Sequence, residues 1–202
     1  MEVLCGRNPV LEALRAGRSI NKILIVDGSN IGSIKEIMAL AREKKVLLQF
    51  VEKKQLDQMS QGENHQGIIA YAAPKDYVDW DEILLKARRK EEVPLILMLD
   101  GIEDPHNFGA ILRTADAAGV HGVIIPKHRA VPLTAGVAKA SAGAVEYVPV
   151  ARVTNLAQVM EKLKGEGCWI VGTDAEAKTP HFEADLSGPL VVVMGNEAKG
   201  LG

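Results

Sequence analysis

The spacing of apolar residues over the first 74 positions predicts a small α/β unit. Apolar runs of strand length alternate there with stretches whose apolar residues recur every three or four positions. The predicted strands are Lys22–Val26, Val46–Val51 and Gly67–Ala73, and the predicted helices begin at Asn8-Pro9 and span Gly32–Lys45. The polar stretch at 60–66 is expected to be a loop.

From residue 95 the pattern changes to apolar strands separated by helices. The predicted strands are Leu95–Leu99, Gly122–Ile125, Cys168–Gly172 and Leu190–Met194. Two of these runs, Leu-Ile-Leu-Met-Leu and Leu-Val-Val-Val-Met, lack alternation, which is typical of strands buried on both faces of a parallel sheet. The sequence therefore predicts an α/β domain over 95–202, joined to the first unit (1–74) by a linker at 75–94 that holds one helix, Trp80–Arg89.

Composition narrows the function classes. Hydrophobic residues make up 47% and charged residues 25%, as in ordinary globular domains, and aromatics only 4%, which disfavours a binder that stacks many bases on rings. The net charge is −2, but residues 1–75 carry 11 Lys and Arg against 8 Asp and Glu, while residues 93–202 carry 9 against 12. That asymmetry is compatible with RNA contact by the front unit and equally with scatter in surface charge.

Other site classes find little support. Cys5 and Cys168 have no CxxC partner, and the five histidines show no ligand spacing, so no metal is expected. No apolar run is long enough to cross a membrane, and residues 1–20 lack the apolar core of a signal peptide. These features predict a cytoplasmic protein that makes no membrane contact.

The segment after the first buried strand, Asp100–Gly119, is one candidate for chemistry, because ligands bind beyond the carboxyl ends of parallel strands. Asn107 is expected to cap the helix that follows. Arg113 lies almost opposite the apolar stripe of that helix, flanked by Ala110 and Ala117. Small neighbours would let a ligand, a partner or a second subunit cover this face, although a solvated Arg on an exposed face is the simpler interpretation.

The segment Gly195–Gly202 is the second candidate. A glycine directly after a buried strand lets a ligand approach the backbone, and Glu197 lies where an acid could orient a ligand or an Arg. A plain strand-to-helix turn with a capping acid is the alternative. Neither GxGxxG nor GxxxxGK[ST] occurs, which argues against nicotinamide, P-loop and ordinary Rossmann methyltransferase sites.

Taken together, these segments resemble the SpoU (TrmH) family of SPOUT RNA methyltransferases. The first family motif appears as Asn107-Phe-Gly-Ala-Ile-Leu-Arg113, the middle segment as Lys139-Ala-Ser-Ala-Gly143, and the second motif as Gly195-Asn-Glu-Ala-Lys-Gly200. The front half, with Cys5-Gly-Arg-Asn-Pro9 and His65-Gln-Gly67, is similar to the L30-like substrate-binding domain of the RlmB branch. The family's third motif, Ser-Leu-Asn, has no counterpart in these 202 residues. We therefore expect the knot-forming C-terminal part to be missing from the domain at 95–202, and cofactor binding to be poor.

The resemblance implies transfer of a methyl group from S-adenosyl-L-methionine to a ribose 2′-oxygen of structured RNA, by a homodimer. It assigns catalysis to Asn107, Arg113 and Glu197. The guanidinium of Arg113 stays charged, so we expect it to bind phosphate or the developing oxyanion. The cofactor-binding residues that it implies are Gly172, Thr173, Gly195, Asn196, Gly200 and Leu201. The substrate implied is 23S ribosomal RNA (a guanosine ribose). The alternatives are transfer RNA as substrate, or a non-catalytic RNA-binding homologue.

Overall fold

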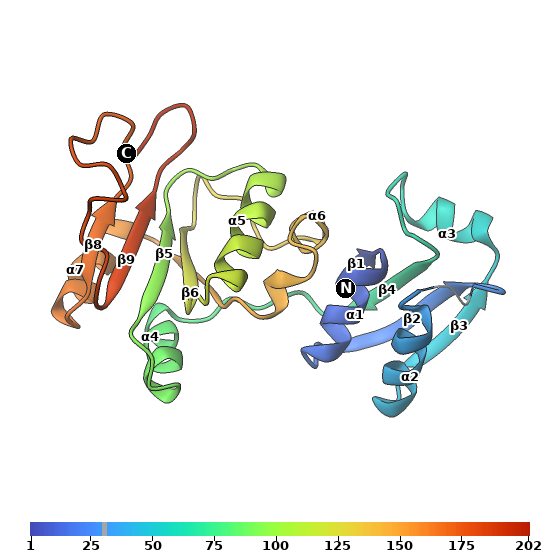
Figure 1. Ribbon diagram of the computed structural model, residues 1–202. Helices are drawn as coiled ribbons and strands as arrows, with labels where there is room; N and C mark the ends of the chain where they lie inside the picture. Colours follow the sequence, from blue (N-terminus) through green and yellow to red (C-terminus); the bar gives the residue numbers. More distant parts are fainter. Residues whose placement is uncertain (30–31) are drawn as a thin grey trace. The chain divides into compact units, whose positions relative to one another are not determined.

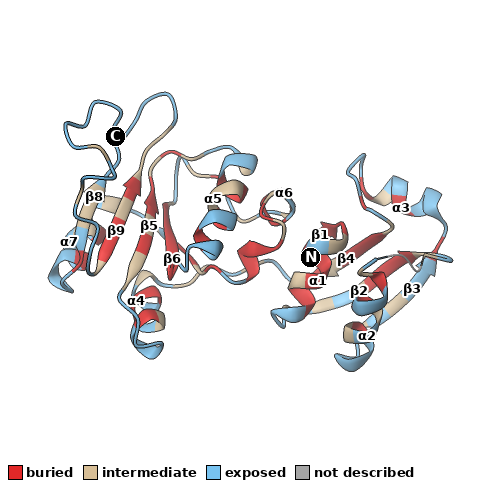
Figure 2. Ribbon diagram, viewed as in Figure 1, coloured by how far each residue is buried: buried red, intermediate tan, exposed pale blue. Residues whose placement is uncertain are grey.

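The computed structural model describes residues 1–29 and 32–202, which form two compact units with a sheet each (Figure 1). The first unit comprises residues 1–75 together with 133–147, and the second comprises 76–132 and 148–202. The chain therefore passes from one unit to the other three times. Buried residues concentrate on the strands and on the inner faces of the helices in each unit (Figure 2).

The first unit is built on a mixed sheet with the strand order β1-β4-β2-β3. Its elements are β1 Glu2–Cys5, α1 Arg7–Arg15, β2 Ile20–Val26, α2 Ile34–Glu43, β3 Leu47–Val51, α3 Lys53–Met59, β4 Ile68–Ala72, α6 Ala135–Ala140 and the short 3₁₀ helix η1 Ala144–Glu146. β4 is antiparallel to both β1 and β2, whereas β2 and β3 are parallel. Leu56 of α3 packs with Leu24 and Ile69 in one cluster of buried residues.

The second unit is built on a parallel sheet with the order β7-β6-β5-β9-β8. Its elements are α4 Trp80–Arg89, β5 Leu95–Leu99, α5 Pro105–Ala117, β6 Gly122–Pro126, β7 Val150–Val153, α7 Leu156–Gly165, β8 Trp169–Gly172 and β9 Leu190–Met194. The chain leaves β5 toward β6 and β7 and later returns to β9 through β8. This change of direction lies between β5 and β9, and the carboxyl ends of all five strands meet at one edge.

Burial in this sheet follows strand position. The first four residues of β6 are buried, as expected for a strand covered on both faces, and α4 and α7 contribute Ile83, Leu84 and Leu163 to the core on one side. β8 is an edge strand, so its residues are only partly covered, and Trp169 is 72% exposed. The predicted α/β class with a mostly parallel sheet is confirmed.

Two segments pack in a different part of the structure from the one predicted from their position in the sequence. Residues 76–94, expected as a linker, belong to the second unit, because α4 buries Ile83 and Leu84 in its core. Residues 133–147 lie within the stretch assigned to the methyltransferase domain, yet they pack in the first unit, where Arg18 donates to the buried Glu146 carboxylate. The domain boundaries given above therefore differ from those of the compact units.

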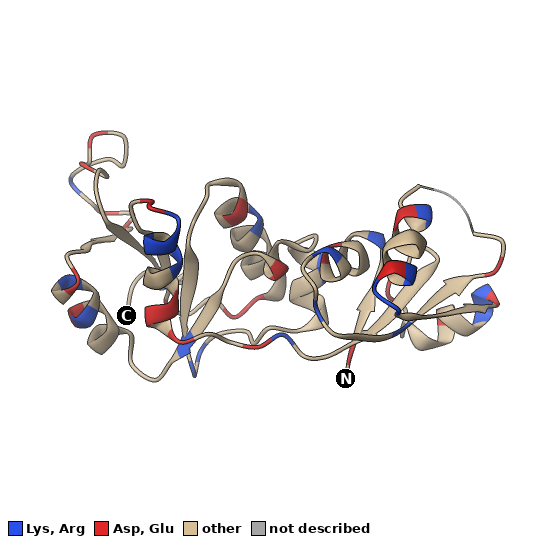
Figure 3. Ribbon diagram, turned by 90° about the horizontal axis from the view of Figure 1, so that it is seen from below, with Lys and Arg blue, Asp and Glu red and all other residues tan. Residues whose placement is uncertain are grey.

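Lys and Arg are interspersed with Asp and Glu along the helices and loops drawn in Figure 3. Of the helices in 1–29 and 32–202, none has the length and apolar character needed to span a bilayer.

Candidate active site

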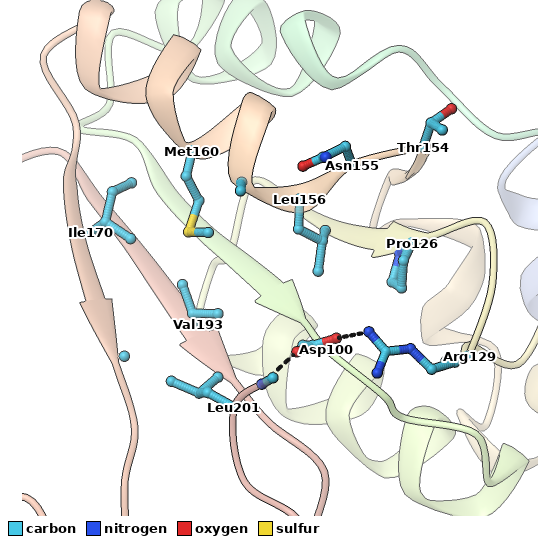
Figure 4. A pocket seen from close by; sticks show the side chains of 13 residues that line it. Asp100, Pro126, Arg129, Thr154, Asn155, Leu156, Met160, Ile170, Val193 and Leu201 are labelled. Atoms are coloured by element: carbon cyan, nitrogen blue, oxygen red, sulfur yellow. Dashed lines mark hydrogen bonds and ion pairs between the residues drawn. The ribbon is translucent and has the colours of Figure 1, made fainter.

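A cavity of the second unit lies at the carboxyl edge of its parallel sheet (Figure 4). Its volume is about 510 Å³, which is within the usual range for small-molecule sites. Residues at or just after the ends of the five strands and from α7 line it: Asp100, Pro126, Arg129, Thr154, Asn155, Leu156, Ala157, Met160, Ile170, Gly172, Val193, Leu201 and Gly202. Open parallel sheets bind ligands at this edge, where the strand order changes direction.

The cavity has an apolar side and a charged side. Leu156, Met160, Ile170, Val193 and Leu201 supply aliphatic and thioether surface, and they come from α7, β8, β9 and the loop after β9 (Figure 4). Such a surface suits a flat, partly apolar group such as a purine. A ligand with an apolar ring system and a charged end would match both sides.

The charged side consists of Asp100, which follows β5, and Arg129, which follows β6. An Arg129 guanidinium nitrogen lies 3.6 Å from the Asp100 Oδ1 atom, and the Gly202 amide donates to Oδ2 at 2.9 Å. Arg129 has φ of +59°, a left-handed conformation that non-glycine residues adopt rarely. The sequence analysis assigned neither residue a role, although Asp100 directly follows a buried strand.

The loop after β9 closes on itself tightly. The backbones of Asn196 and Gly200 exchange two hydrogen bonds, of 2.9 and 2.8 Å, and the Asn196 side chain donates to the Gly101 carbonyl at 2.8 Å. A Cβ on Gly195 would lie 2.2 Å from the Gly200 carbonyl, so only glycine fits there. This turn places Leu201 beside Gly172, where an added Cβ would be 2.8 Å from the leucine side chain.

Only two of the six predicted cofactor residues line the cavity directly. Gly172 and Leu201 line the cavity, whereas Gly195 and Gly200 shape the turn that carries Leu201. Thr173 does not line it: its amide and its hydroxyl both donate to the Val193 carbonyl, and so fix the end of β8 to β9. Asn196 lines a smaller, adjacent cleft instead.

Asn107 and Glu197, two of the predicted catalytic residues, line this smaller cleft of about 350 Å³ together with Asn196. Asn107 was expected to cap α5, and this expectation is wrong. The cap is Asp104, whose Oδ1 accepts from the Asn107 amide at 2.8 Å. The helix begins earlier than expected because of Pro105. Proline suits the first helical position, since no N–H is needed there, and the residue before it, Asp104, becomes the cap. Asn107 therefore lies in the first turn, with its side chain beside the cleft.

Arg113, the third predicted catalytic residue, lies apart from the other two. It is exposed on α5, six residues after Asn107, which corresponds to about 9 Å along a helix. Within the part of the chain that the structure describes, no hydrogen bond or ion pair involves its guanidinium. Its donors are therefore available to a group from outside the second unit of the same chain.

A third cleft, of about 440 Å³, lies in the first unit and joins the two front segments singled out above. The Arg7 amide donates to the Gln66 side chain and the Arg7 Nε to the Gln66 carbonyl, both at 3.1 Å. His65 accepts from the Gly67 amide through Nδ1, so its Nε2 carries the proton shared with Asp57 at 2.9 Å. Lys53 adds a second cation, and together these residues suit a polyanion with hydrogen-bonding edges.

The comparison with protein families matches nearly the whole chain. The description "SpoU rRNA Methylase family" covers residues 94–202, and "RNA 2′-O ribose methyltransferase substrate binding" covers residues 3–78. Among the described residues, no group of three His, Cys, Asp or Glu side chains gathers as a metal site would require.

Known relatives agree with the family match. A protein of Staphylococcus saprophyticus, assigned to the TrmH family of tRNA/rRNA methyltransferases, is 50% identical over 98% of this chain and 80% of its own length. One of Bacillus subtilis, with the same family assignment, is 45% identical over 100% of this chain and 80% of its own length. The SpoU methyltransferase AviRb of Streptomyces viridochromogenes, solved in complex with AdoMet, aligns with a TM-score of 0.79 at 23% identity, over 99% of this chain and 74% of its own.

Proposed function

Because this chain belongs to the SpoU rRNA methylase family, we propose that it transfers the methyl group of S-adenosylmethionine to a ribose 2′-oxygen of structured RNA. The observation that carries this proposal is the cavity at the carboxyl edge of the parallel sheet, bounded by the Gly195–Leu201 turn. AviRb, whose fold this chain shares, was solved with that cofactor.

The residues present fit the cofactor. A Cβ on Gly195 would overlap the Gly200 carbonyl, so glycine permits the turn that brings Leu201 beside Gly172 at the cavity. The apolar side suits the adenine, and Asp100, Asn155 and Arg129 offer polar partners for the rest. Bound there, the cofactor supplies an electrophilic methyl group.

The protein's own part in the reaction is to position the ribose and stabilise charge. The 2′-hydroxyl is a poor nucleophile, so orientation and proton removal matter most. We assign the Arg113 guanidinium to a substrate phosphate or to the negative charge that develops on the 2′-oxygen. Asn107 and Glu197, which share one cleft, hold the ribose in this proposal.

The substrate we propose is ribosomal RNA of the large subunit, modified at a guanosine ribose, with transfer RNA as second candidate. The family description names rRNA, and the relatives are named for both RNAs. The cleft of Arg7, Lys53 and Gln66 in the first unit is the proposed contact with the RNA backbone.

We propose a homodimer, in which Arg113 acts in the site of the partner. Its side chain has no partner within the described part of its own chain, and the neighbouring Ala110 and Ala117 leave room for a second subunit. Two inactive variants, Arg113→Ala and Glu197→Ala, should then restore part of the activity when mixed and reassociated, because each mixed dimer keeps one intact site. Failure of every mixture to gain activity would contradict action across the dimer.

The test of the activity is transfer of label from methyl-labelled S-adenosylmethionine to unmodified ribosomal or transfer RNA. A 2′-O-methyl group protects the adjoining phosphodiester from alkaline cleavage, so alkali-resistant labelled dinucleotides identify the position. Arg113→Ala should lose transfer by at least about 100-fold while RNA binding persists. Arg89→Ala, an exposed Arg of α4, is the matched control and should retain it. Undiminished transfer by Arg113→Ala would refute the assignment.

A further inference from the structure

The Asp100 and Arg129 side chains bring opposite charges to one side of the cavity and form a loose ion pair there (Figure 4). Their 3.6 Å separation exceeds a normal N–H···O hydrogen bond. Arg129 is 70% exposed, and no hydrogen bond joins its guanidinium to any residue within 1–29 or 32–202. A pair whose cation is exposed to this extent contributes little free energy, so it does not hold the guanidinium in place.

Both Asp100 and Arg129 can still bind polar groups of a ligand. Asp100 is only 15% exposed, and its Oδ2 accepts from the Gly202 amide, while its Oδ1 faces Arg129 at 3.6 Å without a hydrogen bond. Arg129 offers the planar set of donors that binds a carboxylate in two parallel hydrogen bonds. It does so from a left-handed backbone conformation, which costs about 1 kcal/mol or more and is commonly retained at binding sites.

From these observations, and resting on the proposed function, we infer that Asp100 and Arg129 bind the zwitterionic amino acid end of S-adenosylmethionine. Arg129 takes the α-carboxylate, and Asp100 takes the α-ammonium group. The pair presents one charge of each sign, which is what a zwitterion requires. The apolar residues on the other side of the cavity are left for the adenine.

The inference predicts which ligand atoms each side chain recognises. The test is calorimetric binding of three ligands to the 202-residue chain without RNA: S-adenosylmethionine, its decarboxylated form, which keeps the ammonium, and 5′-methylthioadenosine, which lacks both groups. Arg129→Ala should weaken S-adenosylmethionine at least about tenfold, equivalent to 1.4 kcal/mol, and change the other two less than about twofold. Asp100→Asn should weaken the two ligands that carry the ammonium.

Two further variants separate recognition from folding. Arg129→Gly removes the same side chain but suits the positive φ, so it should reproduce the selective loss in a protein that is not destabilised. Lys127→Ala removes a charge from the same loop at an exposed position that does not line the cavity, and it should leave all three affinities unchanged.

Three results would overturn the inference. An unchanged affinity of Arg129→Ala for S-adenosylmethionine would exclude the carboxylate contact, and if RNA binding fell instead, Arg129 would contact phosphate. Equal losses for all three ligands would indicate a general change in the cavity. If the unaltered chain bound 5′-methylthioadenosine as tightly as S-adenosylmethionine, the amino acid end would make no contact and the inference would fail, whereas methyl transfer to RNA tests the proposed function separately.

Discussion

The buried Glu146 carboxylate holds the 133–147 segment in the first unit, and its replacement should measurably destabilise that unit. Only 1% of the side chain is exposed, and it accepts from Arg18 at 2.8 Å and from Lys75 at 3.2 Å. Arg18, itself 6% exposed, also pairs with Glu2 and the Ala73 carbonyl. Glu146→Gln preserves the shape of the side chain but turns one acceptor into a donor that faces these cations.

Removing one partner of a buried ion pair costs about 3–5 kcal/mol, because the remaining charge stays desolvated. Arg18 keeps two of its partners in the variant, so we expect the lower end, about 3 kcal/mol. For a unit of this size, each 1 kcal/mol lowers the melting temperature by roughly 4–8 °C. A matched control is Lys139→Ala in the same segment: the Lys139–Glu63 pair is 39% and 42% exposed, and its loss should cost less than about 1 kcal/mol.

The assay uses the uneven distribution of tryptophan. Trp80 and Trp169 are the two tryptophans of the chain, and both belong to the second unit. Tryptophan fluorescence therefore follows the second unit during urea unfolding, and far-UV circular dichroism follows both. Glu146→Gln should move the dichroism transition to lower urea much further than the fluorescence transition. A shift below about 1 kcal/mol, or one no larger than that of Lys139→Ala, would refute the role given to this network.

Three further outcomes are expected. Gly195→Ala should weaken S-adenosylmethionine binding at least about tenfold in calorimetry, because its Cβ would lie 2.2 Å from the Gly200 carbonyl; unchanged binding would contradict this account of the turn. Asp104→Ala should lower the free energy of unfolding by about 1 kcal/mol in urea titrations, while Asp104→Asn keeps the cap of α5. Burial raises the pKa of the Cys5 and Cys168 thiols. At pH 8 both thiols should therefore react with a disulfide reagent more slowly than a free thiol does, and their reaction should become faster above pH 9. Fast reaction of the folded chain at pH 8 would count against this.

The strands that the sequence predicts best are those made of uninterrupted apolar residues. Leu95–Leu99 and Leu190–Met194 have the predicted bounds, since five consecutive apolar residues suit a central strand. The short edge strands β1 and β7 were not predicted, because four residues with a polar member give little periodic signal. Helix α7 was missed although a signal existed: Asn155 caps it, and its apolar residues recur at helical spacing.

What a single sequence does not provide is the pairing of distant residues. Arg18 and Glu146 are 128 positions apart, and nothing local in either segment predicts their contact. For that reason chain order alone groups residues 133–147 with the second unit, whereas they pack in the first. The same holds for Asp100 and Arg129, which follow adjacent parallel strands and meet only because those strands are paired.

In the candidate site, too, the sequence predicts individual residues but not which of them lie together. Asn107 and Glu197 were predicted from separate motifs, and the structure brings them to one cleft, because β5 and β9 are neighbours in the sheet. Arg113 shares a motif with Asn107 but not its location: six residues of helix turn it by about 120° relative to Asn107, besides the rise along the axis. The two ends of this motif therefore lie on different faces: Asn107 lines the cleft of its own chain, and Arg113 is exposed. In the proposed function, a second molecule, RNA or another subunit, completes the site at this exposed cation.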